Sequence, residues 1–401
     1  MRTENNIRVA YVVDEFPSPT ETFVANEIRG LRRCGAYVTV FALHRGKTGA
    51  APDCPVFYRD EDQPSVPVAG GRAHLDAARL AVQLDWRAPT QLAYALRNVT
   101  TALRFARIAR RKDIHHVHGQ FAFTPTDIAL MMARAEELSA SFSAHAWDVY
   151  CAGATLPAKL HHAGLCLTCT HAARRHIESH VEPGDRSKIT CIHHGTDLQR
   201  FSFSPRYQPE VPPLILAVGR LVPKKGFETL LYACRRLRER LPFRCRIVGD
   251  GPLRPRLVRI ICKLGLRDEV SLPGAVPHRE MPATYRQADV LAAPSIVAPD
   301  GDRDGLPNVV TEAMAGGVPV VGSRLSGIPE AVEDERTGLL TIPGESARLA
   351  DALHRMLTDN ALRRRCIDNA RRRMEQEFDV QQNSRRVYEA IRRTASGDSA
   401  V

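Results

Sequence analysis

The chain has 401 residues, of which 44% are hydrophobic, so it is too long for one ordinary core and apolar enough to bury two. Its longest apolar runs, LILAVG and ADVLAAP, are much shorter than the roughly 18 to 20 residues of a membrane-spanning helix, and its first residues do not resemble a signal peptide. A net charge of +11 is consistent either with an anionic partner or with arginines that simply face solvent. We therefore expect a cytoplasmic protein of two domains, and peripheral contact with the inner face of a membrane stays open.

Strand-like and helix-like segments alternate through the first half of the chain. Helices are expected at residues 21–35, at residues 73–112 and from Pro125, and strands at IRVAYVV, YVTVFAL, IHHVHG, SASFSAH, LCLTCT and KITCIHH. A Pro- and Gly-rich connection separates the second strand from the basic helices at 73–112. This alternation is typical of a parallel sheet with crossover helices.

A second alternation follows the segment FSFSPRYQPEVPP, which has the composition of an interdomain linker. Helices are expected from Phe227, from Leu253, near Met281 and, as a group of three, over residues 347–396, and strands at PLILAVGR, FRCRIVGD, EVSLPG and ADVLAAPS. The sequence thus predicts an α/β protein of two Rossmann-like domains, at 1–205 and 206–375, with a C-terminal helix at 376–401 that could pack back on the first domain. Two such domains predict a ligand in a cleft at the carboxyl ends of their strands.

Two common nucleotide-binding motifs are absent from the sequence. The first strand runs into VDEFPSPTETF without Gly-x-Gly-x-x-Gly, and no Gly-x4-Gly-Lys-Ser/Thr occurs anywhere. Dinucleotide-dependent hydride transfer and NTP hydrolysis are therefore disfavoured.

The ten cysteines are scattered through strand-like and helix-like runs, which predicts reduced, packed thiols and no disulfides. Cys166 and Cys169 form a Cys-x-x-Cys pair with His161, His162 and His171 nearby, but no second pair has zinc-finger spacing. We expect no metal site there.

The segment DGDRDGLPNVVTEAMAGG combines a loop with a helix start. Asp304 and Gly305 precede a helix that we expect to begin near Leu306. Pro307 suits the first turn of this helix, because an N–H at that position has no partner within the helix and proline lacks one. The free amides and positive dipole end of a helix start form a phosphate site. Glu312 follows Asp304 by about two helical turns and lies on broadly the same side of the helix.

Two cations follow the strand in ILAVGRLVPKKGF. Arg220 lies just beyond the strand end, and Lys225 precedes the next helix. A bidentate arginine and a mobile lysine match a diphosphate leaving group, whose charge grows as its bond to a sugar breaks. The alternative is a pair of ordinary loop cations.

In order along the chain, these segments resemble family 4 of the retaining glycosyltransferases, which have the GT-B fold of two Rossmann-like domains facing a cleft. The matching segments cover nearly the whole chain: FPSPTETFVANEI, HVHGQFA, SFSAHAWD, IHHGTDLQRF, AVGRLVPKKGFETLL, IVGDGP, ADVLAAPS and DRDGLPNVVTEAMAGGVPVV. FPSPTETF and DGDRDGLPN are most similar to members that assemble bacterial exopolysaccharides.

The resemblance implies transfer of a hexose from a nucleotide diphosphate sugar to an acceptor hydroxyl, with retained anomeric configuration and without a metal cofactor. The acceptor would be a glycan, a lipid-linked molecule or a small molecule, and no nucleic acid is expected as a partner. The alternatives are a nucleotide-sugar epimerase of the same fold, glycosylation of a small-molecule metabolite, and a non-enzymatic sugar- or nucleic-acid-binding protein.

The resemblance also assigns roles to residues. Arg220 and Lys225 would grip the donor diphosphate, Glu312 the ribose hydroxyls and Asp304 the sugar hydroxyls. His145 would approach the sugar from the N-terminal domain. Further donor contacts are expected at Gly219, Gly305, Leu306, Asn308, Val309 and Val276.

The sequence departs from the family pattern at Asp304, where a glutamate is usual, and Asp304 is shorter by about 1.5 Å of reach. Glu21 is either an acceptor contact or a helix-start residue, and His118 is a further candidate for the acceptor side. Asp300 and Asp302 resemble the metal-binding Asp-x-Asp of a different glycosyltransferase fold, but they precede the donor loop here. The basic residues of helices 73–112 either face water or meet an anionic bilayer: Arg97, Arg104, Arg107, Arg110, Arg111 and Lys112.

Overall fold

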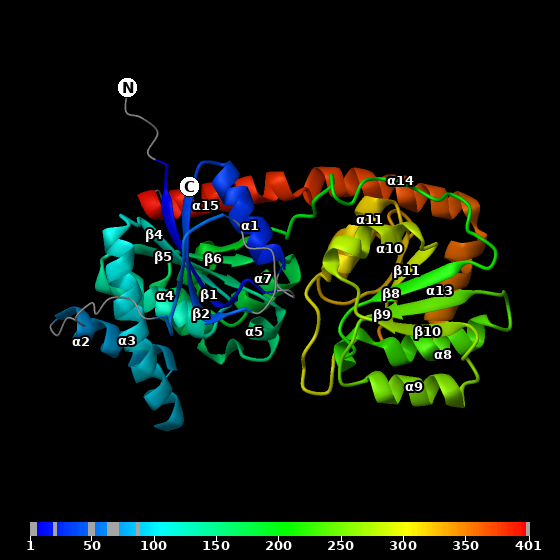
Figure 1. Cartoon of the computed structure of the whole chain (residues 1–401), viewed down its shortest axis with the longest axis horizontal. Coiled ribbons are helices and arrows are strands. Elements are labelled where there is room, and N and C mark those ends of the chain that lie inside the picture. Colours follow the sequence, from blue (N-terminus) through cyan, green and yellow to red (C-terminus); the bar gives the residue numbers. More distant parts are fainter. Residues whose placement is uncertain (1–5, 19–21, 47–52, 62–71, 86–88, 398–401) are drawn as a thin grey trace. The chain divides into compact units, whose positions relative to one another are not determined.

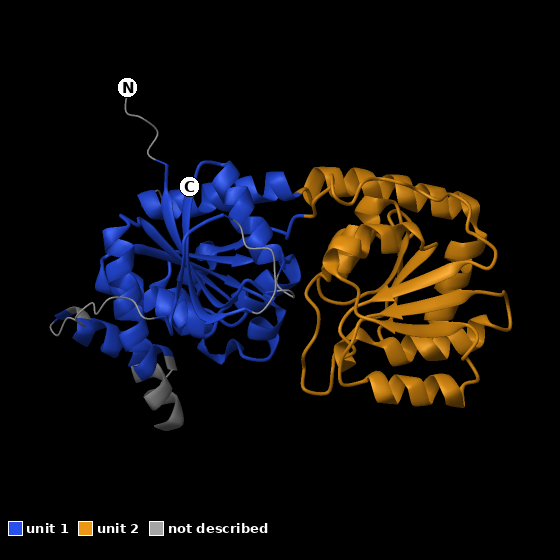
Figure 2. Ribbon diagram, in the orientation of Figure 1, with its two compact units in different colours: residues 1–195, 380–401 blue, residues 196–379 orange. Residues whose placement is uncertain are grey.

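Two parallel sheets organise this computed structural model, which describes residues 6–18, 22–46, 53–61, 72–85 and 89–397 (Figure 1). Each sheet is the centre of one unit. Unit 1 contains residues 1–195 and 380–401, and unit 2 contains residues 196–379 (Figure 2).

The sheet of unit 1 has seven strands in the order β3-β2-β1-β4-β5-β6-β7, with neighbours paired in parallel. Its strands are β1 (Arg8–Phe16), β2 (Tyr37–Arg45), β3 (Val56–Tyr58), β4 (His116–Gln120), β5 (Ser139–Ala144), β6 (Leu165–Thr168) and β7 (Ile189–Cys191). Its helices are α1 (Thr22–Arg33), α2 (Arg72–Asp85), α3 (Pro89–Arg111), α4 (Thr124–Ala135), α5 (Ala146–Tyr150), α6 (Leu156–His162), α7 (His171–Glu178) and α15 (Val380–Ser396). The near-continuous burial of β1 and β2 is the pattern of strands covered on both faces.

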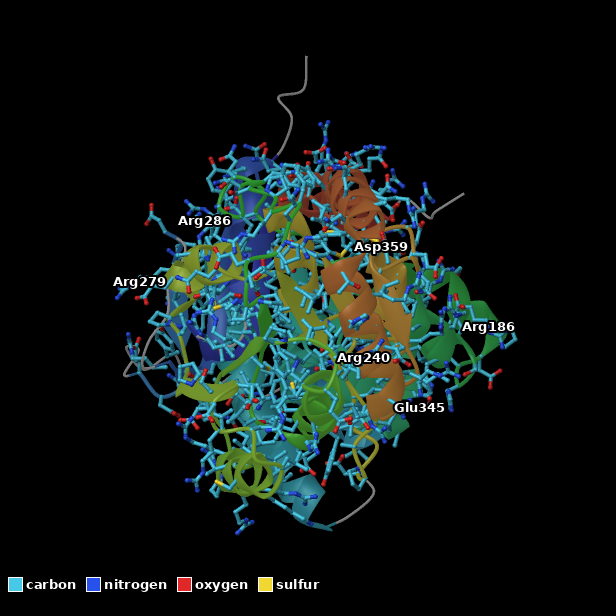
Figure 3. All side chains as sticks on the ribbon, turned by 90° about the vertical axis from the view of Figure 1, so that its right-hand side faces the viewer. Arg186, Arg240, Arg279, Arg286, Glu345 and Asp359 are labelled. Atoms are coloured by element: carbon cyan, nitrogen blue, oxygen red, sulfur yellow. The ribbon has the colours of Figure 1, made fainter. Side chains whose placement is uncertain are left out.

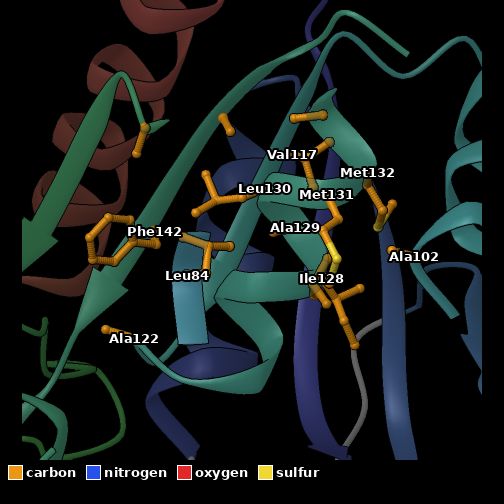
Figure 4. Packing of buried hydrophobic residues seen from close by; sticks show 14 of the residues in the cluster. Leu84, Ala102, Val117, Ala122, Ile128, Ala129, Leu130, Met131, Met132 and Phe142 are labelled. Atoms are coloured by element: carbon orange, nitrogen blue, oxygen red, sulfur yellow. The ribbon is translucent and has the colours of Figure 1, made fainter. Parts of the chain in front are cut away.

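Helix α4 fills the core on one face of this sheet. Ile128 and Met131 of α4 lie in one buried cluster with Val117 of β4, Leu84 of α2 and Phe142 of β5 (Figure 4). Burial of such side chains contributes roughly 1.5 to 3 kcal/mol each. The apolar face of α4 therefore anchors β4 and β5, whose carboxyl ends carry candidate site residues.

Helix α15 covers the other face beside α1, although it lies at the far end of the sequence. Val387 and Ile391 of α15 share a buried cluster with Ile28 of α1. The two helices approach closely at Gly30, where a Cβ atom would lie 2.0 Å from the Ser384 Oγ. Unit 1 is thus completed by a segment that follows all of unit 2.

The sheet of unit 2 has six parallel strands in the order β10-β9-β8-β11-β12-β13. Its strands are β8 (Leu214–Val218), β9 (Arg244–Val248), β10 (Val270–Gly274), β11 (Val290–Ala293), β12 (Val320–Ser323) and β13 (Leu339–Thr341). Its helices are α8 (Phe227–Leu237), α9 (Arg254–Lys263), α10 (Met281–Arg286), α11 (Asn308–Gly316), α12 (Ile328–Ala331), α13 (Ser346–Thr358) and α14 (Asn360–Glu377).

The Pro-rich segment at 201–213, expected as a linker, packs on unit 2. Phe201 is buried in a unit 2 cluster, and the Tyr207 hydroxyl donates to Asp368 at 2.8 Å. The buried guanidinium of Arg363 donates to the carbonyl of Arg206 at 2.9 Å. The chain passes between units at 195/196, ten residues before the expected 205/206, because these contacts hold the segment.

The parallel α/β fold class is confirmed in both units, and none of the ten cysteines, which all lie in the described residues, forms a disulfide. Strands β3, β12 and β13 were not predicted. Each has only three or four residues, and β3 lies in the Pro- and Gly-rich connection. Among the described residues, no helix combines the length and the apolar character needed to cross a bilayer.

Candidate active site

The order of the unit 2 sheet reverses between β8 and β11, which are neighbours although they are its first and fourth strands. Ligands of open parallel sheets bind at this kind of reversal, at the carboxyl ends of the strands. The loop after β8 carries Arg220 and Lys225, and the loop after β11 carries Ser295 and Asp304. Arg220, Lys225 and Asp304 therefore come from the two loops that flank the reversal.

Lys225 and Asp304 are in direct contact. The Lys225 ammonium donates to both Asp304 oxygens, at 3.0 and 2.9 Å, and the Ser295 hydroxyl donates to the same carboxylate at 2.9 Å. The Lys225 side chain is 17% exposed and the Asp304 side chain is 9% exposed. Gly219, at φ 155°, leaves room for the lysine stem, because a Cβ atom there would lie 3.1 Å from Lys225 Cε. Sequence reasoning gave these residues separate roles and missed Ser295.

A second ion pair ties the same two loops together. Lys224 lies 2.9 Å from a carboxylate oxygen of Asp302, and its carbonyl accepts from the Ile296 amide at 2.9 Å. Gly226 has φ 64°, and a Cβ atom there would lie 1.9 Å from the carbonyl oxygen of Pro294. The two loops are held against each other by backbone contact and by two parallel ion pairs.

Helix α11 begins at Asn308, and Pro307 is its N-cap residue with φ −64° and ψ 127°. This differs from the expected start near Leu306 with Pro307 inside the first turn. No side chain caps the helix, and within the described part of the chain the amides of Asn308 and Val309 have no acceptor. The carbonyl of Gly305 accepts from Gly327 at 2.9 Å and so fixes the loop that leads into the helix. Free amides at a helix start suit an anion.

Glu312 is held by two neighbours that sequence reasoning did not find. The buried Tyr285 hydroxyl donates to Glu312 Oε2 at 2.8 Å, and His278 Nε2 lies 3.1 Å from Oε1. Burial, followed by the Glu312 charge, raises the pKa of Tyr285 well above its usual value, so the phenol stays protonated and donates. Val276 is partly buried and packs against the hydrophobic cluster that contains Tyr285.

Arg220 differs from Lys225 in being exposed. Within the residues that the structure describes, its guanidinium has no hydrogen bond or ion pair. Its carbonyl accepts from Val222 at 2.8 Å, which shapes the turn after β8. Among the described residues of these two loops, Arg220 is thus a cation without a partner, whereas Lys224 and Lys225 are both paired with carboxylates.

In unit 1, His145 lies at the carboxyl end of β5 and is 8% exposed. Its amide donates to Asp148 at 3.0 Å, and its Nε2 lies 3.2 Å from the side-chain oxygen of Gln120. Gln120 donates to Glu27 at 2.8 Å, and Tyr11 donates to the same carboxylate at 2.9 Å. Burial lowers the pKa of His145 well below its usual value and raises the pKa of Glu27 to about 7. A chain of polar side chains thus supports a neutral His145.

His118 is not available to an acceptor, contrary to the expectation. It is fully buried, and its two ring nitrogens lie 2.7 and 3.0 Å from the hydroxyls of Ser141 and Ser143. Burial lowers the pKa of His118 to about 3, so the ring is neutral. Histidines occupy alternate positions of β4 and serines occupy alternate positions of β5. This pattern in the sequence could have predicted that the two sets pair across the strands. Glu21 lies outside the described residues.

Comparison with known proteins identifies the activity class. Residues 200–373 match the family model described as "Glycosyl transferases group 1". Unit 2 is a group 1 glycosyltransferase domain. The glycosyltransferase is 29% identical over 397 residues to the putative colanic acid biosynthesis glycosyltransferase WcaL of Escherichia coli, covering 94% of this chain and 97% of that one. It is 35% identical over 209 residues to the amylovoran biosynthesis glycosyltransferase AmsK of Erwinia amylovora, over 52% of this chain and 51% of that one.

Solved structures support the GT-B fold of this glycosyltransferase. HepE of Anabaena, solved in complex with UDP, has a TM-score of 0.71 at 18% identity, over 96% of this chain and 100% of that one. Sucrose-phosphate synthase of Thermosynechococcus elongatus has a TM-score of 0.73 at 19% identity, over 98% of this chain and 100% of that one. The fold and the activity class expected from the sequence are thus confirmed.

Proposed function

We propose that this glycosyltransferase moves a hexose from a nucleoside diphosphate sugar to an acceptor hydroxyl, with retained anomeric configuration, during bacterial exopolysaccharide assembly. The names of WcaL and AmsK support the pathway, and the UDP bound to HepE supports a nucleotide sugar donor. Glycosylation of a small-molecule metabolite is the alternative acceptor class.

The observation that carries the proposal is the set of groups at the reversal of the unit 2 sheet. Arg220, Lys225 and the free amides of Asn308 and Val309 would stabilise the diphosphate as its negative charge grows. Glu312, oriented by Tyr285, would accept hydrogen bonds from ribose hydroxyls. No carboxylate is assigned as a nucleophile, and a phosphate oxygen of the leaving group would take the acceptor proton.

Asp304 would read the sugar. In this protein Asp304 accepts from Lys225 and Ser295, which leaves part of its hydrogen-bonding capacity for a sugar hydroxyl. A site built to pair a hydroxyl discriminates strongly against a sugar that lacks it.

We propose that transfer needs no metal ion, because protein cations and amides supply the positive charge. The pairing of Asp302 with Lys224 supports this proposal, since the carboxylate already has a cationic partner. Activity in excess EDTA should equal the untreated activity. Loss of transfer in EDTA with recovery in Mg²⁺ or Mn²⁺ would contradict it.

A donor screen tests the proposed function. Nucleotide diphosphate sugars are first tested for binding by calorimetry, and the binders are then assayed for nucleotide diphosphate release with and without acceptor. A transferase releases nucleotide diphosphate in proportion to glycosylated acceptor, whereas an epimerase converts the donor without acceptor. Binding without turnover for every donor and acceptor would support a sugar-binding protein instead.

We also propose peripheral contact with an anionic bilayer through α3 and the residue after it. Arg97, Arg110, Arg111 and Lys112 are exposed, whereas Arg104 donates to backbone carbonyls of the segment that follows β3, at 3.3 and 3.4 Å. Exposed arginines also occur elsewhere in both units, among them Arg186, Arg279 and Arg286 (Figure 3). The opposing interpretation is a solvated basic surface.

A further inference from the structure

Three potential metal ligands meet at the carboxyl edge of the unit 1 sheet. His145 follows β5 directly, Cys169 follows β6 directly, and His194 lies three residues beyond β7. Strands β5, β6 and β7 are adjacent and parallel, so the residues that follow them emerge at one edge. The topology thus gathers residues that the sequence spreads over fifty positions.

The ligand atoms are close enough to share one ion. One nitrogen of each histidine and the Cys169 sulfur all lie within 4.8 Å of one another. In a tetrahedral zinc site, with bonds of about 2.0 to 2.3 Å, neighbouring ligand atoms are separated by roughly 3.3 to 3.8 Å. Side-chain adjustments of about 1 Å or less therefore close the site.

A hydrogen-bonded neighbour holds one of these imidazoles in position. Gln120, which contacts His145 Nε2, is itself held by Glu27, the kind of outer hydrogen bond that orients a metal-binding histidine. His194 also lines a small cavity with Phe23.

We propose that His145, Cys169 and His194 form a binding site for Zn²⁺ in unit 1. One thiolate and two imidazoles match the ligand preference of zinc, whereas Mg²⁺ and Ca²⁺ prefer oxygen. Three protein ligands leave a fourth position for water. The proposed site uses Cys169 of the Cys166-x-x-Cys169 pair considered from the sequence, but it does not use Cys166. Cys166 lies in the apolar core on the other side of β6.

Binding has a defined proton balance. At pH 8 the Cys169 thiol loses its proton to buffer as the Zn–S bond forms, and imidazoles, which are ordinarily neutral at that pH, lose none. Each bound Zn²⁺ therefore releases one proton. If His145 takes part in transfer, a role that rests on the proposed function, Zn²⁺ is an inhibitor because it binds a nitrogen of the His145 ring.

Direct binding on the full chain tests the site. Calorimetric titration of Zn²⁺, in two buffers of different ionisation enthalpy, should give binding with about one proton released per ion. Co²⁺ should give the charge-transfer absorption of a thiolate-bound ion and visible bands of a tetrahedral ion. Co²⁺ binding without the thiolate absorption in the unmodified chain would overturn the proposal without any variant.

Variants then assign the ligands. Cys169→Ser and His194→Ala should weaken Zn²⁺ binding by at least about tenfold while the thermal transition is retained. Cys262→Ser, an exposed thiol of unit 2, is the matched control. Cys191→Ser tests a neighbouring alternative, because the rings of His171 and His193 lie 5.5 Å apart beside that part of the chain. Binding that follows Cys191 and ignores Cys169 refutes the site.

Activity gives a separate readout. Zn²⁺ should inhibit transfer by the unmodified chain, EDTA should reverse the inhibition, and Cys169→Ser should keep its transfer activity in Zn²⁺. Because Zn²⁺ binding is measured without donor or acceptor, a chain without transferase activity would contradict the proposed function and leave the binding result standing. Inhibition that is equal in Cys169→Ser and in the unmodified chain would refute the inhibitory role.

Discussion

The ammonium group of Lys225 lies 3.0 and 2.9 Å from the two carboxylate oxygens of Asp304. The cation that we propose to bind the diphosphate is therefore paired with the residue that we propose to read the sugar. Under the proposed assignment, a donor competes with Asp304 for Lys225 or shares it. The roles of the two residues are coupled, and single variants of either one report on both.

The first prediction concerns the two cations at the reversal of the sheet. Arg220→Ala and Lys225→Ala should each lower kcat by roughly 10² to 10³, because each cation acts where charge develops in the transition state. Arg259→Ala, an exposed arginine of α9 in the same unit, serves as the control for lost surface charge. Unchanged kcat/KM in both site variants would remove the diphosphate assignment.

The second prediction concerns the coupling between Lys225 and Asp304. Asp304→Asn should bind bare nucleotide diphosphate at least as tightly as the parent chain, since it frees Lys225 from its carboxylate partner. Lys225→Met should weaken the same binding, and the double variant should show a coupling energy of about 0.5 to 3 kcal/mol. Calorimetry on the four proteins measures it, and strictly additive effects would contradict the shared role.

The third prediction concerns Glu312 and Tyr285. Glu312→Gln should weaken binding of nucleotide diphosphate and of intact donor alike, because an amide accepts less strongly than a carboxylate from ribose hydroxyls. Tyr285→Phe removes the donor that orients Glu312 and should weaken both ligands by about tenfold. Tyr207→Phe, which loses a hydroxyl bond to Asp368, is the matched control. Equal losses in both tyrosine variants would indicate a general effect on stability.

The fourth prediction concerns pH and Glu27. Burial raises the pKa of this carboxyl from 4.5 to about 7 in the folded protein, so folding takes up a proton within that interval. The stabilising contribution is therefore complete below about pH 4.5 and is lost as the pH rises through about 7. Relative to Glu27→Gln, the free energy of unfolding of the parent chain should fall by roughly 3 kcal/mol across this interval.

Urea unfolding of both proteins at several pH values provides the comparison. His116 and His118, with pKa values lowered by burial to about 3, have the opposite effect, since their contribution is lost as the pH falls below about 6.5. Both proteins contain them, so their contribution cancels in the difference. A difference that stays constant across the interval would show that Glu27 does not titrate there.

The fifth prediction concerns the exposed cations of α3. Vesicles with anionic lipid should bind the chain, and binding should weaken as salt rises, because the Debye length is about 8 to 10 Å at physiological salt. Substitution of Arg110, Arg111 and Lys112 by Ser should weaken sedimentation with vesicles. The charge-matched control replaces Arg259, Arg279 and Arg286. Equal losses in the two triple variants would favour a nonspecific effect of net charge.

The alternation of strands and helices could be predicted from the sequence because buried parallel strands are continuous apolar runs, as in LILAV of β8. Strand β3 could not be predicted from the sequence, because its three residues acquire their conformation from pairing with β2. The start of α11 was misplaced because Pro307 suits both the N-cap and the first turn, and its ψ of 127° settles the choice.

The loops of the donor site could be located from sequence, but not their contacts. The Lys225–Asp304 pair spans 79 positions and depends on the pairing of β8 with β11. Tyr285 reaches Glu312 from a short helix whose sequence shows no polar motif. His118 was misjudged because its position at a strand end suggested access, whereas the serines of β5 enclose its ring.

Helix α15 has a consequence for the order of events during synthesis. The face of α1 that carries Ile28 and Gly30 is covered by α15, which leaves the ribosome only after the whole of unit 2. At about 5 to 20 residues per second, translation of unit 2 takes on the order of 10 to 40 s. Throughout this interval the apolar face of α1 on the nascent chain lacks its native cover and is a natural target for chaperones. All strands and helices of unit 2 are synthesised before α15, so unit 1 is completed after unit 2.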